Sequence, residues 1–529
     1  MNRRVLAQSL VMAGLLLGAT ALSAPVFAQS GKIITGGFDV GPGGFPGNFN
    51  PMSATGGFTW FTTYFEPLVT YNAELTALEG NLATEYSVSE DQLKYTFKLA
   101  EETWHDGEAF TSADVKYTIE LAKNPASASV FAARLSNVAS VDTPDDRTVV
   151  VTLSAPNASI LSTFAQLMIL PEHALSKMKP EEIAGSTWWS TTPIGTGPFK
   201  FTQYVTDQYV ELAADEDYRR GRPKVDHLVN RYFKNPAAAV AALRAGEIQF
   251  TYVESDEAPS FAGNDQFRVV EGASFVVNYI GFNQRVDYWK DVRVRQAVMY
   301  AIDRNAIIES LYGGAAKPAN CGYVADQLVP QGLNDYAYDP EKARALLAEA
   351  NWSQIAGNQP ITWLTYYGSP QAANVMAAVQ AMLAEVGINV VPRVVDVPTY
   401  NATVYKEGTP DWNAFPMTYA GLQNGPDPAG LNPGLNQSQL PPAGANVMRI
   451  EMPELSAAFD AALAETDQTQ VNAEWQDVCR VMNEQLPWGT MWVANRYGVA
   501  SNQLENFVWV PAPAGGPYQA HPELWDIKQ

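Results

Sequence analysis

The sequence predicts an α/β fold made of about three compact units, and three observations carry this prediction. The chain has 529 residues, of which 47% are hydrophobic and 17% are charged, which is the composition of an ordinary globular protein. At ~100–200 residues per domain, this length corresponds to about three domains. Segments with the two-residue alternation of strands are interleaved with segments that show the spacing of amphipathic helices, and this order favours α/β units over sandwiches or bundles.

The N-terminal segment has the pattern of a secretory signal peptide. Arg3 and Arg4 precede a short apolar run, and Val26-Phe27-Ala28 then supplies a signal-peptidase site. The apolar run is shorter than the about 20 residues that span a bilayer. We therefore expect residues 1–28 to be removed, leaving a soluble exported chain. No lipid anchor is expected, because no Cys follows the cleavage site.

The first half of the remaining chain has a strand–helix–strand pattern. Residues 94–99 alternate polar and apolar side chains, as a half-buried strand does. Thr111 and Asp114 have the spacing of a capping box, which predicts that a helix begins there and continues through 115–121. Residues 147–153 have the pattern of a further strand.

The second half predicts longer helices. Asp291 is placed to cap one long helix, whose apolar stripe continues to Leu311 and which ends at Gly313-Gly314. Three further elements follow: a helix at 341–350 opened by Asp339-Pro340, a helix at 371–386, and a strand at 388–395.

The net charge restricts the class of partner. The chain carries 34 Lys and Arg against 56 Asp and Glu, which gives a formal net charge of −22. Nucleic acid and anionic lipid surfaces would be repelled, so neither is expected as a partner. An acidic surface also keeps an exported protein soluble, so the charge does not identify a ligand.

Motifs for catalysis, metals and cofactors are scarce. The histidines show no metal-ligand spacing, and the chain has no C-x-x-C, H-E-x-x-H, Walker or G-x-S-x-G motif. Residues 176–179 match the S-x-x-K pattern of penicillin-binding enzymes, but the companion S-D-N and K-T-G motifs are absent. We therefore expect no enzyme, no metal and no cofactor, with a secreted hydrolase using Ser176 as a remote alternative. The four histidines are His105, His173, His227 and His521.

The chain has two cysteines, Cys321 and Cys479. An even pair in an exported protein can form one disulfide bridge. Two buried free thiols are the alternative, since the sequence does not give the distance between them.

Aromatic side chains beside loop signals are candidate ligand contacts. The chain has 13 Trp, 24 Tyr and 22 Phe, and aromatic faces stack on sugars, peptides and planar cations. An alternating strand would place Trp488 and Trp492 on one face, where both could stack on a ligand. Core packing is the alternative for each of the five candidates, which are Phe58, Trp60, Tyr419, Trp488 and Trp492.

Blocks of sequence along the chain carry a resemblance to a known family. The most recognisable is Trp104-His105-Asp106-Gly107-Glu108, followed by residues 111–115. The other blocks are 50–51, 64–69, 82–91, 194–199, 217–223, 243–247, 291–297 and 301–304. From Phe49 onward the chain therefore resembles the family 5 extracellular solute-binding proteins of ABC importers, which bind dipeptides, oligopeptides and nickel.

The resemblance implies a class II periplasmic-binding-protein fold, with two lobes joined by a hinge and an extra third domain. Lobe I would comprise residues 29–72, 194–285 and 490–529, the extra domain 73–193, and lobe II 286–489. The chain would cross between the lobes near Gly281-Phe282-Asn283 and again at 487–493, so that the lobes can close over a ligand. Asn283 is therefore a candidate site residue. The turn at His105-Asp106-Gly107 would be structural and not a catalytic dyad.

The same resemblance leaves the solute open. In the peptide binders, an Asp shortly before an Asp-Pro pair usually pairs with the α-amino group of the peptide. Here the pair is Asp427-Pro428, and the anchoring position falls on Asn424, although Asp427 itself could serve. The neutral amide of an Asn cannot form the charge-assisted hydrogen bond to an ammonium group, which is worth about 1–3 kcal/mol. This difference favours a neutral solute such as an oligosaccharide.

The resemblance also implies the partners and the location of the protein. We expect a monomeric periplasmic receptor that delivers its solute to the permease subunits of an ABC importer at the inner membrane. The family's base rate favours an oligopeptide as the solute, with an oligosaccharide as the alternative.

Overall fold

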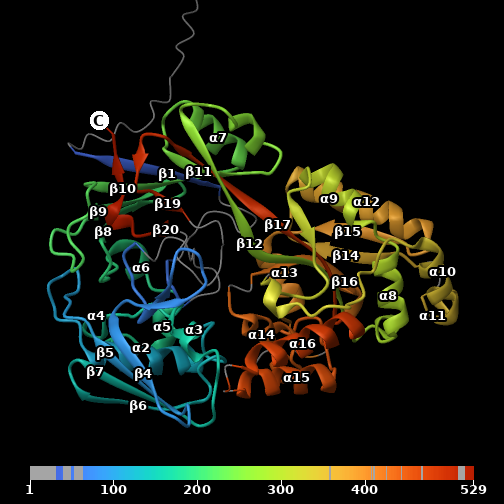
Figure 1. Cartoon of the computed structure of the whole chain (residues 1–529), viewed down its shortest axis with the longest axis horizontal. Coiled ribbons are helices and arrows are strands. Elements are labelled where there is room, and N and C mark those ends of the chain that lie inside the picture. The colour runs from blue at the N-terminus through green and yellow to red at the C-terminus, as the bar shows by residue number, and fades with distance from the viewer. Residues whose placement is uncertain are drawn as a thin grey trace, which may run out of the picture. The chain divides into compact units, whose positions relative to one another are not determined.

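The computed structural model of the chain describes residues 31–39, 49–52, 63–323, 325–356, 359–406, 408, 411–423, 426–441, 444–465, 467, 469–509 and 519–528. Within these residues a mixed sheet of eleven strands is the largest element (Figure 1). Neighbouring strands are, in order, β15 (Val390–Val394), β14 (Ile361–Thr365), β16 (Met417–Gln423), β12 (Phe267–Phe282), β17 (Trp488–Ser501), β11 (Phe250–Val253), β1 (Ile33–Asp39), β10 (His227–Phe233), β9 (Tyr209–Ala214) and β8 (Phe199–Val205), with β13 (Ala316–Pro318) beside β17. We call its two ends the β15 end and the β8 end.

Strands β12 and β17 belong to both ends of the sheet. They pair antiparallel with each other, and in Figure 1 they run side by side through the middle of the sheet. At 497–500, β17 also pairs with β11 of the β8 end, whereas β12 pairs with β16 of the β15 end over 276–282. The register between the two long strands is irregular from Ala273 to Val277, and Phe275 has a φ of 49°. The pairing is therefore interrupted where the chain passes from one end to the other.

Helices cover both faces of the β15 end. On β14, Trp363 packs in one core with residues of α8, α10 and α12, whereas Leu364 packs in a second core with residues of α15 and α16. Successive residues of a strand point to opposite faces, so the two cores lie on opposite sides of the sheet. The helices of this end are α8 (Val292–Tyr300), α9 (Arg304–Tyr312), α10 (Pro340–Glu349), α11 (Trp352–Ile355), α12 (Pro370–Glu385), α13 (Val397–Val404), α14 (Asn432–Leu435), α15 (Pro453–Ala464) and α16 (Val471–Gln485).

A second, antiparallel sheet, here called the small sheet, shares its core with the β8 end. Its strand order is β4 (Ala83–Val88), β5 (Lys94–Leu99), β7 (Thr148–Leu153) and β6 (Val138–Asp145). Phe97 and Val151 of this sheet belong to the same core as Ile119 of α2 and Leu228 of the β8 end. The small sheet is therefore packed as one body with the β8 end. The helices near it are α2 (Ser112–Lys123), α3 (Ile160–Phe164), α4 (Glu172–Leu175), α5 (Pro180–Ile183) and α6 (Trp188–Thr191), and α7 (Pro236–Arg244) lies at the β8 end.

Short elements complete the described chain. The two-stranded pairs are β2 (Val69–Tyr71) with β3 (Leu78–Gly80), β18 (Leu504–Glu505) with β21 (Asp526–Ile527), and β19 (Val508–Trp509) with β20 (Gln519–Ala520). The 3-10 turns are η1 (Pro125–Ser127), η2 (Ala258–Phe261), η3 (Asp287–Trp289), η4 (Asp326–Leu328), η5 (Trp412–Ala414), η6 (Pro428–Leu431), η7 (Gln437–Gln439) and η8 (Pro522–Leu524). None of the described helices is long and apolar enough to cross a membrane.

Most of the elements predicted from local pattern are confirmed. The alternating segment at 94–99 is β5, and helix α2 begins after Thr111 with the predicted capping box to Asp114. Asp339 caps α10, and α12 ends one residue before Val386. The α/β class is confirmed as well. The domain boundaries implied by the resemblance stay predictions.

The long helix predicted from Asp291 to Gly313 is wrong in one respect, because the structure divides it into α8 and α9. Asp303 begins the second helix, since its side chain accepts a hydrogen bond from the amide of Ala306. The apolar stripe continues through both helices, and Ala301 and Ile302 between them are fully buried. The apolar stripe therefore predicted correctly which residues are buried, but it did not predict that the helix is divided in two.

A disulfide joins Cys321 to Cys479 of α16. It settles the alternative that the sequence left open between one bridge and two free thiols. The bridge fixes the loop after β13 against the second core of the β15 end, to which both cysteines belong.

Candidate functional site

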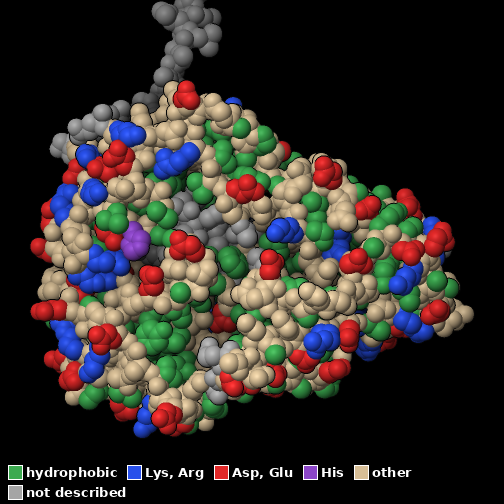
Figure 2. All heavy atoms as spheres, in the orientation of Figure 1, with side chains coloured by type: hydrophobic (Ala, Val, Ile, Leu, Met, Phe, Trp, Pro, Cys, Tyr) green, Lys and Arg blue, Asp and Glu red, His purple; other side chains and the backbone are tan. Residues whose placement is uncertain are grey.

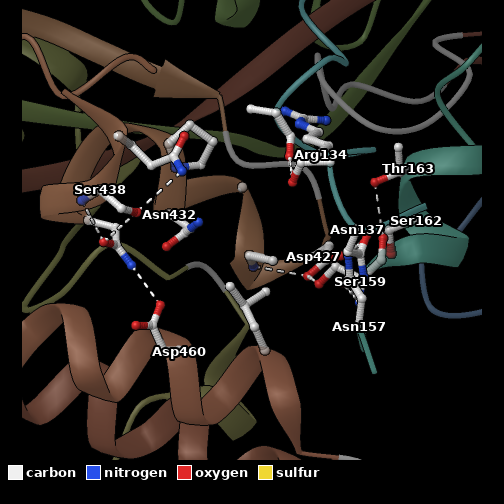
Figure 3. A pocket seen from close by; sticks show the side chains of 18 of the residues that line it. Arg134, Asn137, Asn157, Ser159, Ser162, Thr163, Asp427, Asn432, Ser438 and Asp460 are labelled. Carbon is white, nitrogen blue, oxygen red and sulfur yellow. Dashed lines mark hydrogen bonds between the residues drawn. The ribbon is translucent and has the colours of Figure 1, made fainter. Parts of the chain in front are cut away.

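A polar cavity of about 270 Å³ lies between the loops and helix beside the small sheet and the turns η6, α14 and η7 of the β15 end (Figure 3). This volume is near the lower limit of the ~300–1,000 Å³ typical of ligand pockets. The charged side chains in its wall are Arg134, Asp427 and Asp460, and the other lining residues are small or neutral. In Figure 3, Arg134 and Ser159 reach the cavity from one side, and Asp427 and Asn432 reach it from the other.

Asp427 holds its carboxylate at the cavity because it caps a turn. It is the N-cap of η6, and its Oδ1 accepts a hydrogen bond from the amide of Ala429 at 2.9 Å. The same oxygen accepts a hydrogen bond from Ser159 Oγ at 3.2 Å, and this bond joins the β15 end to the segment beside the small sheet. Among the described residues, no hydrogen bond reaches Oδ2. One carboxylate oxygen is therefore available to a ligand that carries a hydrogen-bond donor or a positive charge.

Arg134 supplies the positive charge on the opposite wall. Its Nη1 donates a hydrogen bond to Gln166 Oε1 at 3.0 Å, and its guanidinium carbon lies 5.8 Å from the centre of the Phe131 ring. Burial lowers the pKa of Arg134 below its ordinary value, and the negative charge of Asp427 opposes this shift. The two charges therefore act on each other across the cavity.

Two tyrosines extend the polar environment of Asp427. Tyr71 donates a hydrogen bond to Ser162 Oγ at 2.8 Å, and the hydroxyl of Tyr323 is buried without a hydrogen-bond partner among the described residues. Burial raises the pKa of both tyrosines, and the charge of Asp427 raises it further. Both are therefore neutral donors near the carboxylate. Tyr323 follows the disulfide at Cys321 by two residues, so the bridge helps to position it.

Further contacts join the β15 end to the rest of the protein. The amide of Ala158 donates to the carbonyl of Leu463 at 3.1 Å, next to the Ser159–Asp427 bond. Away from the cavity, Gln371 Nε2 donates to Ser255 Oγ at 3.4 Å. The two sides of the cavity are thus in direct contact.

A continuous stretch of the chain that includes the small sheet and most of the cavity wall matches a known family. Residues 77–439 match the bacterial extracellular solute-binding proteins, family 5 middle region. The chain belongs to this family. The prediction of a solute-binding protein rather than an enzyme is thereby confirmed.

Relatives and solved structures extend the family 5 match to nearly the whole chain. A protein of Brucella melitensis, provisionally named an ABC transporter peptide-binding protein, is 63% identical over 96% of this chain and 98% of its own length. The oligopeptide-binding protein AppA from Bacillus subtilis, solved with a nonapeptide, superposes with a TM-score of 0.83 at 22% identity, covering 94% of this chain and 99% of AppA. NikZ from Campylobacter jejuni, solved with Ni(L-His), gives a TM-score of 0.80 at 22% identity over 93% of this chain and 99% of NikZ. These structures confirm the predicted fold.

Trp488 and Trp492 of this family 5 protein lie outside the cavity, and the prediction that they share one face is wrong. Thr490 pairs with Tyr279 and Trp492 with Asn278, so Met491 is an extra residue that reverses the alternation. Trp488 therefore packs in the second core, stacked on Tyr279 at 4.2 Å, whereas Trp492 is fully buried in the first core.

Two further candidates are buried in the β15 end. Asn283 donates its amide to Pro416 O and its Nδ2 to Phe415 O, so it ties the end of β12 to the start of β16. Tyr419 lies on β16 against Trp363 and Tyr367, and burial raises its pKa well above the ordinary value. Neither lines the cavity. Phe58, Trp60 and Asn424 lie outside the described residues, so of the eight candidates Asp427 is the one placed in the cavity wall.

The residues that a hydrolase or a catalytic dyad would use have structural or exposed positions. His105 Nε2 lies 2.8 Å from Gly197 O and its Nδ1 accepts from the amide of Gly195, which is the structural turn expected. Lys179 of the S-x-x-K pattern is exposed and pairs with Glu182 at 3.7 Å. The Ser176 side chain is exposed at the end of α4.

Arg134 and Ser159 were not predicted from the sequence. Arg134 follows two alanines in a segment without regular structure, and Ser159 precedes a helix of five residues. No local pattern distinguishes them from surface residues. An arginine in an otherwise small and apolar run, Phe131-Ala132-Ala133-Arg134-Leu135, is the one signal that could have drawn attention to this segment.

Proposed function

We propose that this protein is the periplasmic receptor of an ABC importer, and that it captures a peptide between two lobes for delivery to the membrane permease. The observation that carries the proposal is the position of Asp427, whose carboxylate reaches the cavity from the β15 end with one oxygen available. Such an oxygen is the partner that an α-ammonium group requires. The name of the Brucella relative and the nonapeptide bound by AppA support a peptide as the solute.

Closure of the lobes would follow from the two long strands. In this proposal lobe II is the β15 end, and the β8 end and the small sheet move together because they share one core. We place the hinge at 273–277 of β12 and at the adjoining part of β17, where the register is interrupted, and not at 281–283, where the resemblance placed the first crossing. Small-angle scattering should therefore show a more compact particle with bound peptide, and identical profiles at saturation would contradict the hinge.

An oligosaccharide is less well supported as the solute. Aromatic platforms are the expected feature of a sugar site, but Trp488 and Trp492 pack in separate cores.

The proposal keeps the remaining expectations from the sequence, which are cleavage of residues 1–28, release into the periplasm without a lipid anchor, and a monomeric state.

Asp427→Asn tests the proposal. The mature protein is first screened against peptide and sugar libraries by thermal shift, since a ligand at 100 times its Kd stabilises by about 2.7 kcal/mol. Calorimetry with the best peptide should then show about tenfold to hundredfold weaker binding to Asp427→Asn, because a charge-assisted bond becomes a neutral one. N-acetylation of the peptide should weaken binding to the wild type by a similar factor and add little in the variant.

The matched control is Asp287→Asn. Asp287 has a side chain that is 92% exposed and lies outside the cavity, so this variant changes the net charge equally and should bind as the wild type does. Stabilisation by sugars and by no peptide would overturn the peptide assignment.

A further inference from the structure

Arg134 differs from the other buried arginines in how few of its donors are used. Arg219 pairs with two carboxylates, whereas Arg295, Arg304 and Arg449 each donate to several backbone carbonyls. A guanidinium has five N–H donors and remains charged in proteins. Arg134 donates one hydrogen bond to the described residues, to Gln166. Four of its donors therefore have no partner among the described residues, although burial makes an unpaired charge costly.

No carboxylate among the described residues neutralises this charge directly. No Asp or Glu oxygen of the described residues lies within 4.0 Å of a guanidinium nitrogen of Arg134. The opposing charge that acts on its pKa is the carboxylate of Asp427, on the other wall. A planar fork of donors that faces a cavity matches the two oxygens of a carboxylate. The group that would complete the contacts of Arg134 on this wall is therefore an anion.

The rest of the cavity offers acceptors without partners. Asn432 Oδ1 and Gln439 Oε1 are buried in its wall and have no hydrogen-bond partner among the described residues. Buried acceptors are normally satisfied, and an unsatisfied one costs free energy. The N–H groups of a peptide backbone would satisfy both. Among the described residues, the cavity thus combines a carboxylate oxygen without a hydrogen bond, two acceptors without partners and a guanidinium that uses one of its five donors.

We propose that Arg134 is the specificity-determining anchor for a carboxylate of the ligand, and that the solute is a short peptide with both termini free. The α-carboxylate pairs with Arg134, the backbone amides face Asn432 and Gln439, and the α-ammonium faces Asp427. This inference rests on the proposed function and deepens it. The cavity of about 270 Å³ carries opposite charges on its two walls, so we expect it to favour short zwitterionic peptides over peptides with blocked termini.

The test compares one peptide in two forms, with a free C-terminus and with a C-terminal amide, by calorimetry. Amidation should weaken binding to the wild type by about tenfold to a hundredfold, because a bidentate charged pair is lost. Arg134→Gln should bind both forms with equal, reduced affinity. Arg134→Lys keeps the charge but not the fork, and it should show a smaller amidation effect than the wild type.

Arg344→Gln is the matched control. Arg344 lies on α10 outside the cavity, where it pairs with Glu341, so the variant should keep the full amidation effect. If peptides bind the wild type but amidation weakens Arg134→Gln and Arg134→Lys as much as the wild type, the role of Arg134 is overturned and the peptide function stands. If no peptide binds the wild type, the proposed function itself fails. Unliganded melting temperatures of both Arg134 variants verify that they are folded.

Discussion

Removal of Arg219 should destabilise the protein strongly, because this residue neutralises two buried carboxylates. Its Nη1 lies 2.5 Å from Glu66 Oε2 and 2.9 Å from Glu102 Oε2, and its Nη2 donates to Asn81 Oδ1 at 2.7 Å. The side chains of Glu66 and Glu102 are 3% and 5% exposed. Burial alone would lower the pKa of Arg219, but Glu66 raises it above its ordinary value.

The magnitude follows from the burial. Breaking a buried ion pair by removing one partner costs about 3–5 kcal/mol, because the remaining charge is uncompensated. Here that charge is Glu102, since Glu66 keeps a pair with Arg220 at 3.6 Å. Arg219→Met should therefore lower the free energy of unfolding by about 3–5 kcal/mol near pH 7. At an unfolding entropy of ~2.1 cal/mol/K per residue, this corresponds to a decrease in Tm of about 3–5 °C.

The effect should depend on pH in a defined direction. Burial raises the pKa of Glu102, and the hydrogen bond from Arg219 opposes that shift. Without Arg219 the folded-state pKa rises further above the unfolded one, so the folded state takes up a proton more readily as the pH falls. The deficit of Arg219→Met should therefore shrink on acidification.

Scanning calorimetry of the wild type, Arg219→Met and the control Arg344→Met measures the effect. Arg344 forms an exposed pair with Glu341, and its loss should change stability by less than about 0.5 kcal/mol. Equal Tm values for the two variants would refute the reasoning. So would a deficit of Arg219→Met that grows as the pH is lowered.

Two other predictions concern the disulfide and a buried histidine. Replacing both Cys321 and Cys479 by Ser should cost about 2–5 kcal/mol, because the bridge closes a loop of 158 residues in the unfolded chain; an unchanged Tm would contradict this, and dithiothreitol should have the same effect on the wild type. Burial lowers the pKa of His105 below its ordinary value, so the unfolded chain takes up a proton that folded His105 resists as the pH falls through about 6.5. Stability should therefore fall on acidification, and urea titrations at neutral and acid pH should show a smaller fall for His105→Gln.

The elements that the sequence predicted well depend on neighbouring residues. The capping box of Thr111 and Asp114 and the alternation at 94–99 are complete within a few residues, so they hold without knowledge of the fold. The helix from Asp291 failed because two local signals compete there. The apolar stripe favours continuation, but Asp303 caps a new helix, and the stripe carries no information about that competition.

The candidate site was predicted in part. Asp427 was reached through a motif, and the structure places it in the wall of the cavity. Trp488 and Trp492 were misplaced because one extra residue, Met491, reverses the face of every side chain beyond it. Arg134 could not be placed, because its approach to Asp427 depends on the packing of the small sheet beside the β15 end.

The net charge was equally uninformative about the site, since acidic side chains are spread over the face shown in Figure 2 rather than gathered at one site.

The position of Arg134 and Asp427 also explains why a ligand could control closure. Direct contacts between the β15 end and the rest of the protein include the Ser159–Asp427, Ala158–Leu463 and Gln371–Ser255 hydrogen bonds. Each such bond contributes about 0.5–1.5 kcal/mol net, so contacts of this kind hold the lobes together weakly. A ligand bound to Asp427 on one wall and to Arg134 on the other adds two charge-assisted contacts that only the closed form can make together. A ligand shifts a conformational equilibrium by its difference in affinity for the two states. Under the proposed function, two anchors on different sides of the cavity would therefore make recognition of both peptide termini the driving force for closure.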